Sequence, residues 1–182
     1  EALTELYREA KRWEDLAELY LRRAETQGGS AGAGYRLDLA KLYKNELSDT
    51  SRAIDQLQEI VLASPGHKEA VVELEALLND PDHKERVVEI LRPLYEEADD
   101  WRRQIKLNED RYELAEAPIE RVAVLREPAR LWEERGSDAH RARRALAAAL
   151  ELDPEDGEVR SEFQRLTEAT DAWDELAKTY TS

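Results

Sequence analysis

Apolar residues recur every three or four positions along most of the chain, which is the spacing of one face of an α-helix. The stretch 53–61 shows the pattern in Ala53, Ile54, Leu57, Ile60 and Val61. Runs of β-branched residues, from which strands are built, are almost absent. Helices of about 15–25 Å cannot bury an apolar face alone, so they must pack on one another. The pattern predicts an all-α fold of stacked antiparallel helix hairpins.

Residues that start, stop or bend helices divide this pattern into about eleven segments. Ser48 and Ser137 are good N-cap residues, and each is followed by an aspartate. The four glycines of "QGGSAGAG" at 27–34 predict a long turn, and Pro93 and Pro128 predict bends within their helices. The predicted helices cover residues 1–11, 12–27, 34–47, 49–63, 67–79, 83–98, 100–115, 118–135, 138–152, 156–169 and 171–181.

The sequence also repeats itself. "RWEDLAELY" at 12–20 returns, altered, as "AWDELAKTY" at 172–180. At an offset of 88, Leu3, Leu6, Tyr7, Ala10 and Trp13 match Leu91, Leu94, Tyr95, Ala98 and Trp101. A one-residue insertion then changes the offset to 89, where "SDTSRA" at 48–53 meets "SDAHRA" at 137–142. Because the match spans several segments, we interpret the chain as an array of related helical units.

Three of the four tryptophans, Trp13, Trp101 and Trp173, begin a predicted helix directly after a short turn. A large ring at that place would fill the corner between two hairpins, and truncating it to alanine would cost about 3–5 kcal/mol. A ligand-stacking role is the alternative interpretation of these rings.

Two units of this array resemble tetratricopeptide repeats. The first is "LAKLYKNELSDTSRAIDQLQEIVLASP" at 39–65, with matching positions Leu39, Ala40, Tyr43, Ala53, Leu57, Ile60 and Pro65. The second is "REPARLWEERGSDAHRARRALAAALELDP" at 126–154, which matches through Ala129, Trp132, Ala142, Leu146, Ala149 and Pro154. The resemblance covers about a third of the chain. It implies a right-handed α-solenoid in which residues 1–182 form one domain, and we expect the array to continue in a longer repeat protein.

Two features depart from that family pattern. Each unit carries one extra residue between its two helices. In addition, the predicted helix 34–47 precedes its counterpart 118–135 by five helices. Strict alternation would place those two helices in opposite layers, so either one helix is miscounted or the stacking register breaks near 79–101.

Composition excludes several classes of function. The chain has no cysteine, and therefore no disulfide, thiolate metal site or cysteine nucleophile. No apolar run approaches the roughly 18–20 residues of a membrane span, so we expect no membrane insertion. The absence of cysteine is compatible with the cytoplasm, which is the compartment we expect. The net charge of −15 repels phosphate backbones, which disfavours nucleic acid as a partner.

The middle of the chain differs in charge from its acidic ends. Residues 100–144 carry 11 basic and 10 acidic side chains, so this region is close to neutral. Its grouped arginines are Arg102, Arg103, Arg141, Arg143 and Arg144. Such a region can dock an acidic partner, and the alternative is a solvated helix face with local ion pairs.

No set of residues predicts catalysis, a cofactor or a metal. Asp80, Asp82 and His83 lie close together in "NDPDHKE", but this segment is also an ordinary acidic helix start. The glycine-rich segment lacks the preceding strand and following lysine of a phosphate-binding loop. We therefore expect no enzyme activity from this chain.

The family resemblance implies a non-catalytic scaffold that binds a protein or peptide segment in its concave groove, through the outward residues of each first helix. Those residues are Lys41, Lys44 and Asn45 in the first unit, and Arg126, Arg130 and Glu133 in the second. Their basic bias favours a ligand that carries carboxylates, such as an acidic peptide or helix. The alternatives are a homo-oligomer assembled through terminal helices, and an accessory or regulatory helical domain of a larger protein.

Overall fold

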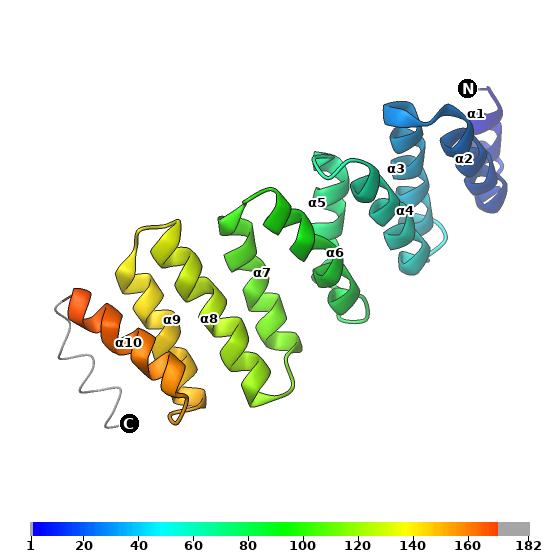
Figure 1. The fold of residues 1–182 in the computed structure, drawn as a ribbon. Coiled ribbons are helices and arrows are strands. Elements are labelled where there is room, and N and C mark those ends of the chain that lie inside the picture. The colour runs from blue at the N-terminus through cyan, green and yellow to red at the C-terminus, as the bar shows by residue number, and fades with distance from the viewer. Residues whose placement is uncertain (1, 171–182) are drawn as a thin grey trace. The chain divides into compact units, whose positions relative to one another are not determined.

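The computed structural model describes residues 2–170 (Figure 1). Within this range the chain forms ten α-helices and no strand, which confirms the predicted all-α fold. The helices are α1 (Ala2–Glu9), α2 (Trp13–Gln27), α3 (Gly29–Asn45), α4 (Thr50–Ala63), α5 (Lys68–Leu77), α6 (Lys84–Glu97), α7 (Trp101–Leu114), α8 (Pro118–Glu134), α9 (Ala139–Leu152) and α10 (Gly157–Ala169). The predicted eleventh helix at 171–181 lies outside the described residues.

The long turn predicted at 27–34 is wrong, because α3 already begins at Gly29. Gly28 and Gly29 have φ angles of +57° and +52°, so two residues are enough to reverse the chain between α2 and α3. Further along α3, a Cβ added to Gly32 would lie 2.8 Å from the carbonyl oxygen of Ala24. This glycine therefore serves the close approach of two helices.

The N-caps predicted at Ser48 and Ser137 are also wrong by one residue. Asp49 caps α4 and Asp138 caps α9, and each side chain accepts the N–H of the residue three positions later. Ser48 and Ser137 have φ angles of +52° and +50°, so they occupy the left-handed position that turns the chain before the cap. Both residue types suit an N-cap, and the conformation of the turn decides between them.

The backbone shows that the repeat contains five helices. Trp13 and Trp101 begin α2 and α7 at the offset of 88, and Thr50 and Ala139 begin α4 and α9 at the offset of 89. Helices α1–α5, the first repeat, therefore correspond to α6–α10, the second repeat. This number explains why α3 and α8 have equivalent sequences although α8 is the fifth helix after α3. Pro93 and Pro128 lie inside α6 and α8, which continue past both prolines.

The chain divides into two compact units, Glu1–Leu94 and Tyr95–Ser182, with the boundary inside α6. In the first unit α3 packs between α2 and α4, and α5 packs against α4 (Figure 1). In the second unit α8 packs on α7 and α9, and α10 covers α9. Most of the family-like positions are buried, whereas Trp132 is half-buried and Pro65 and Pro154 are exposed. The buried ones are Leu39, Ala40, Tyr43, Ala53, Leu57, Ile60, Ala129, Ala142, Leu146 and Ala149. The right-handed stacking and the single-domain division stay predictions.

Candidate functional site

The corner where one helix turns into the next has the same construction three times. An aromatic residue near the end of one helix accepts, through its carbonyl, the N–H of the aspartate that caps the next helix. An arginine three residues after the aspartate pairs with its carboxylate and lays its guanidinium over the aromatic ring. The three sets are Tyr43, Asp49 and Arg52; Tyr95, Asp100 and Arg103; and Trp132, Asp138 and Arg141.

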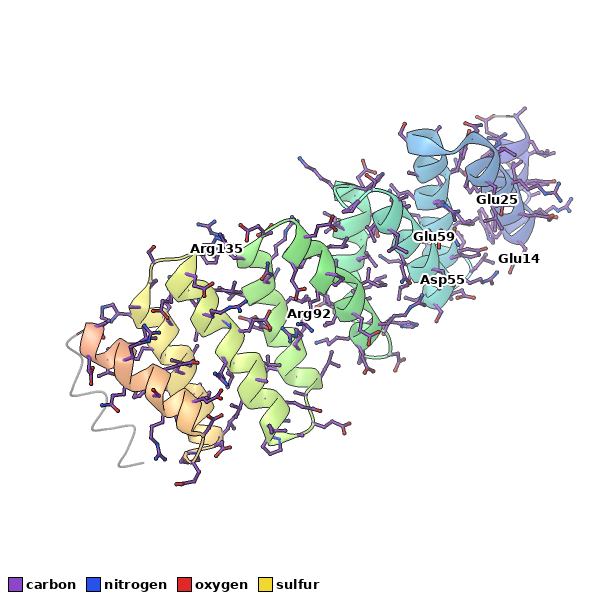
Figure 2. All side chains as sticks on the ribbon, viewed as in Figure 1. Glu14, Glu25, Asp55, Glu59, Arg92 and Arg135 are labelled. Atoms are coloured by element: carbon purple, nitrogen blue, oxygen red, sulfur yellow. The ribbon has the colours of Figure 1, made fainter. Side chains whose placement is uncertain are left out.

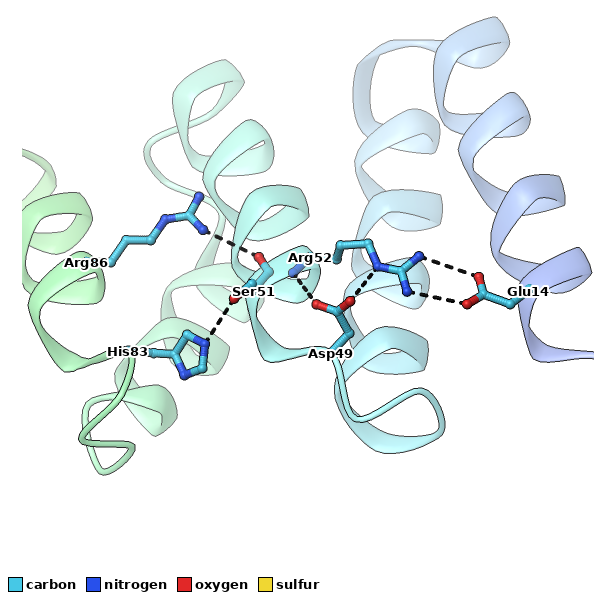
Figure 3. A network of polar contacts seen from close by, with 6 residues as sticks. All are labelled: Glu14, Asp49, Ser51, Arg52, His83 and Arg86. Atoms are coloured by element: carbon cyan, nitrogen blue, oxygen red, sulfur yellow. Dashed lines mark hydrogen bonds and ion pairs between the residues drawn. The ribbon is translucent and has the colours of Figure 1, made fainter.

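In the first repeat, a residue from α2 closes the α3–α4 corner. Arg52 donates from Nε to Asp49 at 2.6 Å, and its two outer nitrogens lie 3.5 and 3.4 Å from the carboxylate of Glu14 (Figure 3). The backbone N–H and the guanidinium of Arg52 lower the pKa of Asp49 below its ordinary value. Each nitrogen edge of this guanidinium thus faces a carboxylate of the same chain.

In the second repeat, the α8–α9 corner lacks that closing acid. At the two repeat offsets Arg52 corresponds to Arg141, and Glu14 corresponds to Arg102. Arg141 pairs through Nε with Asp138 at 3.4 Å and lies 4.3 Å from the centre of the Trp132 ring. Its outer nitrogens have no acceptor, and Arg102 has no ion pair, within the described part of the chain. Two like charges therefore stand where the first repeat has an ion pair.

A cleft of about 460 Å³ opens beside these two arginines, between α7 and the corner. Trp101 and Trp132 meet edge to face in its wall, with ring centres 5.2 Å apart and ring planes at 77°. Arg135, at the end of α8 (Figure 2), adds a third guanidinium, which pairs with Asp99 at 2.9 Å. The lining residues are Trp101, Arg102, Ile105, Trp132, Arg135, Gly136 and Arg141.

A second hollow of about 420 Å³ lies further along α7, and Ile105 lines both. Its wall is mostly apolar, and its lining residues are Ile105, Asn108, Glu109, Tyr112, Glu113, Val124, Leu125, Pro128 and Ala145. We call the two hollows together the α7–α8 groove. One end carries the arginines, the middle is apolar, and the other end carries Glu109 and Glu113.

Asn108 is the one lining residue of the groove that is both polar and buried, with 4% of its surface exposed. Its Oδ1 accepts a hydrogen bond from Arg111 at 2.6 Å, and Arg111 is held in turn by an ion pair with Glu127. The amide nitrogen Nδ2 has no acceptor among residues 2–170. A buried, unpaired donor costs about 1–3 kcal/mol, so this amide favours a further acceptor.

Larger side chains fill the corresponding space in the first repeat. Tyr20 takes the place of Asn108, is 3% exposed, and packs on Tyr35 with ring centres 6.1 Å apart. The Tyr20 hydroxyl also accepts a hydrogen bond from Arg8 at 2.7 Å. At the positions of Leu125 and Ala145 stand Arg36 and Gln56, which are hydrogen-bonded to each other at 2.9 Å.

The helices themselves also approach differently in the two repeats. In the first, Ala24 and Gly32 bring the backbones of α2 and α3 together. Their counterparts at the repeat offsets are Tyr112 and Arg121, whose guanidinium lies 5.5 Å from the centre of the Tyr112 ring. The bulk of this pair stands between α7 and α8, and Tyr112 lines the groove.

Three of the residues predicted to bind a partner are paired within the chain, with the last helix of their own repeat. Lys44 binds Glu73 of α5 at 3.1 Å, and the pairs on α10 are Arg126 with Glu158 and Glu162 and Glu133 with Arg165, all within 3.0 Å. The hydrogen bond from Arg165 lowers the pKa of Glu133. These contacts tie the outward face of each first helix to its own repeat.

The other three predicted residues, Lys41, Asn45 and Arg130, are exposed, and Arg130 lies 4.0 Å from Glu134. On α8, the predicted residues lie on average roughly 130° around the helix axis from Leu125, Pro128 and Trp132, because each residue advances the helix by about 100°. None of the six predicted residues lines the groove.

The grouped arginines of residues 100–144, which we predicted as a docking region, lie in three different environments. Arg102 and Arg141 line the groove, whereas Arg103 and Arg144 are exposed outside its lining. Arg143 is only 2% exposed and donates to Thr170 at 2.6 Å, so it stands in the core where the first repeat has Ile54. The signal that could have located the groove was the arginine at 102, where the repeat alignment places Glu14.

Other features of the described residues do not form a site. His83 lies directly before α6 and is hydrogen-bonded to Asp80 at 3.0 Å and to Ser51 at 3.1 Å. These contacts are those of a residue at a helix start. No group of three or more metal-ligating side chains occurs among residues 2–170, and no helix in that range is long and apolar enough to cross a membrane. The sequence matches no family model, and a search of curated proteins finds no relative.

Proposed function

We propose that this chain is a non-catalytic protein–protein interaction scaffold of the tetratricopeptide-like kind, and that a partner segment binds in the α7–α8 groove. The observation that carries the proposal is the open apolar middle of the groove, where the first repeat is filled. The groove runs along two helices and is floored by Ala145 of α9, so it suits a chain segment lying along it.

Two properties of the groove favour a peptide as the ligand. Leu125, Pro128 and Tyr112 offer partly exposed apolar surface, whose burial is worth about 25 cal/mol per Å². The unpaired amide of Asn108 in the wall suits a backbone carbonyl, which every residue of a peptide provides. A partner segment would thus satisfy both the apolar and the polar part of the site.

The proposal is tested with a displayed library of random 12-residue peptides selected on residues 1–182. The blocking variant is Leu125→Arg with Ala145→Gln, which copies the Arg36–Gln56 hydrogen bond of the first repeat into the groove. Because the other repeat already accommodates that pair, the variant should keep its fold. Its control is Ala76→Arg, which copies Arg165 of the second repeat into an exposed place on α5.

We expect peptides enriched on the natural chain to bind the Ala76→Arg control equally and to lose binding to the groove variant. A third bait, Arg126→Glu with Arg130→Glu, tests the residues predicted from the family resemblance. If that bait alone loses the peptides, the binding face is the outward face of α8. If no peptide is enriched, or if all baits retain it, the proposed groove function is wrong.

A specific observation also supports self-assembly as a second candidate. Leu3 and Leu6 of α1 are 43% and 58% exposed, although Leu91, which matches Leu3, is fully buried. A helix from a second copy could cover this face. Light scattering over a concentration series tests this, because the mass should grow for the natural chain and stay constant for Leu6→Glu.

A further inference from the structure

We propose that the arginine end of the α7–α8 groove recognises one carboxylate of the partner, held between Arg102 and Arg141 beside the two tryptophans. The inference rests on the proposed function of the groove and adds the chemistry of its ligand. The partner segment is accordingly one that carries a glutamate or aspartate close to a large apolar residue.

The first repeat contains the template for this site. There the carboxylate of Glu14 faces the outer nitrogens of Arg52, while Asp49 occupies the Nε side (Figure 3). Arg141 keeps the equivalent Asp138, and its outer nitrogens have no acceptor among the described residues. Guanidinium groups bind carboxylates through paired N–H donors, so the open edge of Arg141 has the geometry for a second carboxylate.

Arg102 distinguishes the α8–α9 corner from a surface position that carries one exposed arginine. It replaces Glu14 with the opposite charge, so the position that closes the corner in the first repeat cannot do so here. Arg102 lies over the Trp101 ring at 4.4 Å and Arg141 lies over Trp132 at 4.3 Å, while the two rings touch. The two cations are thus positioned on adjoining walls of one cleft.

The charge of the cleft fits a single carboxylate. Arg102, Arg135 and Arg141 line it, and Asp99 and Asp138 pair with the last two. Three guanidinium groups against two carboxylates leave one positive charge, on a chain whose net charge is −15. A nucleic-acid strand would bring many negative charges to an acidic surface with one local positive charge, so we assign the cleft to a protein carboxylate.

The second hollow sets the spacing within the partner. Arg102 and Glu109 stand in the two hollows, seven residues apart on α7, which is about 10 Å along the helix axis. An extended segment covers that distance in about three residues. Glu109 repels acids at the far end, so the acidic residue must lie at the tryptophan end and the apolar one over Leu125.

The test uses nine-residue peptide pools with an uncharged fluorophore at the N-terminus and an amidated C-terminus, so that the fixed glutamate is the one carboxylate. Two pools carry Glu-x-x-Leu or Leu-x-x-Glu among serine and alanine, and matched pools replace glutamate with glutamine. We expect the glutamate peptides to bind about tenfold more tightly at low salt. Their advantage should shrink as sodium chloride is raised, because salt screens the attraction.

The decisive variant is Arg102→Glu, which rebuilds the Glu14–Arg52 pair of the first repeat within the second. It should abolish the preference for glutamate over glutamine. Arg102→Gln gives the same readout if the first variant fails to fold. The matched control, Glu14→Arg, makes the reverse change in the first repeat, where Tyr20 fills the groove, and should leave peptide binding unaltered.

Failure of this inference differs from failure of the proposed function. Equal binding of glutamate and glutamine pools, lost together in the Leu125→Arg/Ala145→Gln variant, would overturn the carboxylate site and keep the groove. Persistence of the glutamate preference in Arg102→Glu would also overturn it. Absence of binding by every pool, together with an empty library selection, would overturn both.

Discussion

The α3–α4 and α8–α9 corners have the same backbone and differ in what completes them. Both turn through a serine with positive φ, both begin the next helix with a capping aspartate, and both stack an arginine on an aromatic ring. The first corner receives Glu14 from its own chain, while the second faces Arg102. The difference shows that a repeated scaffold can gain a binding site through side chains alone, with its turns unchanged.

The neighbouring helix pairs, α2–α3 and α7–α8, also differ in their side chains, and here the difference changes how closely the helices pack. Ala24 and Gly32 allow α2 and α3 to meet backbone to backbone, and Tyr20 fills what space remains. Tyr112, Arg121 and Asn108 stand at those positions between α7 and α8. The side chains of the first repeat therefore pack between its helices, whereas the second repeat leaves an open groove. Each prediction below changes one side of this comparison.

The largest expected effect is in the cores, where the two repeats should behave alike. Leu57 and Leu146 are equivalent and each is 1% exposed. Truncating either one to alanine should lower the free energy of unfolding by about 2–5 kcal/mol, through lost burial and the cavity left behind. Urea denaturation followed by circular dichroism measures both values. A loss below about 1 kcal/mol for one of the pair would show that the two cores are not equivalent.

A smaller effect is expected where α2 meets α3. Gly32→Ala places a Cβ 2.8 Å from a backbone oxygen, so the helices must separate, at a cost of about 1–3 kcal/mol. Gly34→Ala, two residues further along the same helix, is the matched control because nothing lies within 4 Å of its added Cβ. That control should be neutral or stabilising by about 0.4–1 kcal/mol, since alanine restricts the unfolded chain. Equal thermal stabilities for the two variants would contradict the close approach.

At alkaline pH the stability of the two repeats should respond differently. Tyr20 of the first repeat can ionise, whereas its counterpart in the second, Asn108, does not titrate. Burial raises the pKa of Tyr20, although the positive charge of Arg8 acts in the other direction. The contribution of a group with a raised pKa is fully present below its unfolded value, about 10, and is lost as pH rises through the folded value. The natural chain should lose more stability above pH 10 than Tyr20→Phe.

Denaturation series from pH 8 to pH 11 on both proteins measure this difference. The two proteins differ at residue 20 alone, so the comparison isolates the buried phenol. Parallel curves would show that Tyr20 ionises as easily in the folded protein as in the unfolded one.

The smallest expected effect concerns the closing ion pair itself. Glu14→Arg copies the charge pattern of the second repeat into the first and should cost less than about 1 kcal/mol, because both partners are substantially exposed. Salt should reduce the difference between the variant and the natural chain. A loss of several kcal/mol, measured by thermal denaturation in low salt, would mean that the corner depends on this pair far more than its exposure indicates.

Much of the fold could be predicted from the sequence, because helical periodicity is a local signal. The positions of α4, α8 and α9 follow from their apolar spacing and flanking residues to within a few residues. The turn at 27–34 was wrong because a glycine run indicates either a flexible loop or close helix contact. Only the partner of Gly32, the carbonyl of Ala24, decides between those two interpretations.

The groove could not be predicted from the sequence, and the reason is a different one. The family resemblance directs attention to outward residues of the first helices, such as Arg126 and Glu133. Here α10 supplies Glu162 and Arg165 to those side chains. The five-helix repeat thus gives that face a partner within the chain, and no local pattern on α8 indicates it. The substitution of arginine for glutamate at 102 is visible in the alignment, but its meaning depends on Arg141 lining the same cleft, which only the structure shows.

The α1–α2 corner carries the same charges in reverse order. Arg12 stands where the later corners have the capping aspartate, Asp15 stands where they have the arginine, and the two still pair at 2.7 Å. The corner accepts either order of the two residues but needs opposite charges. A substitution at one of these positions therefore restricts which residues are accepted at the other, three residues away. Among diverged copies of this unit, we expect substitutions at these positions to occur together, so that covariation alone would reveal where each corner lies.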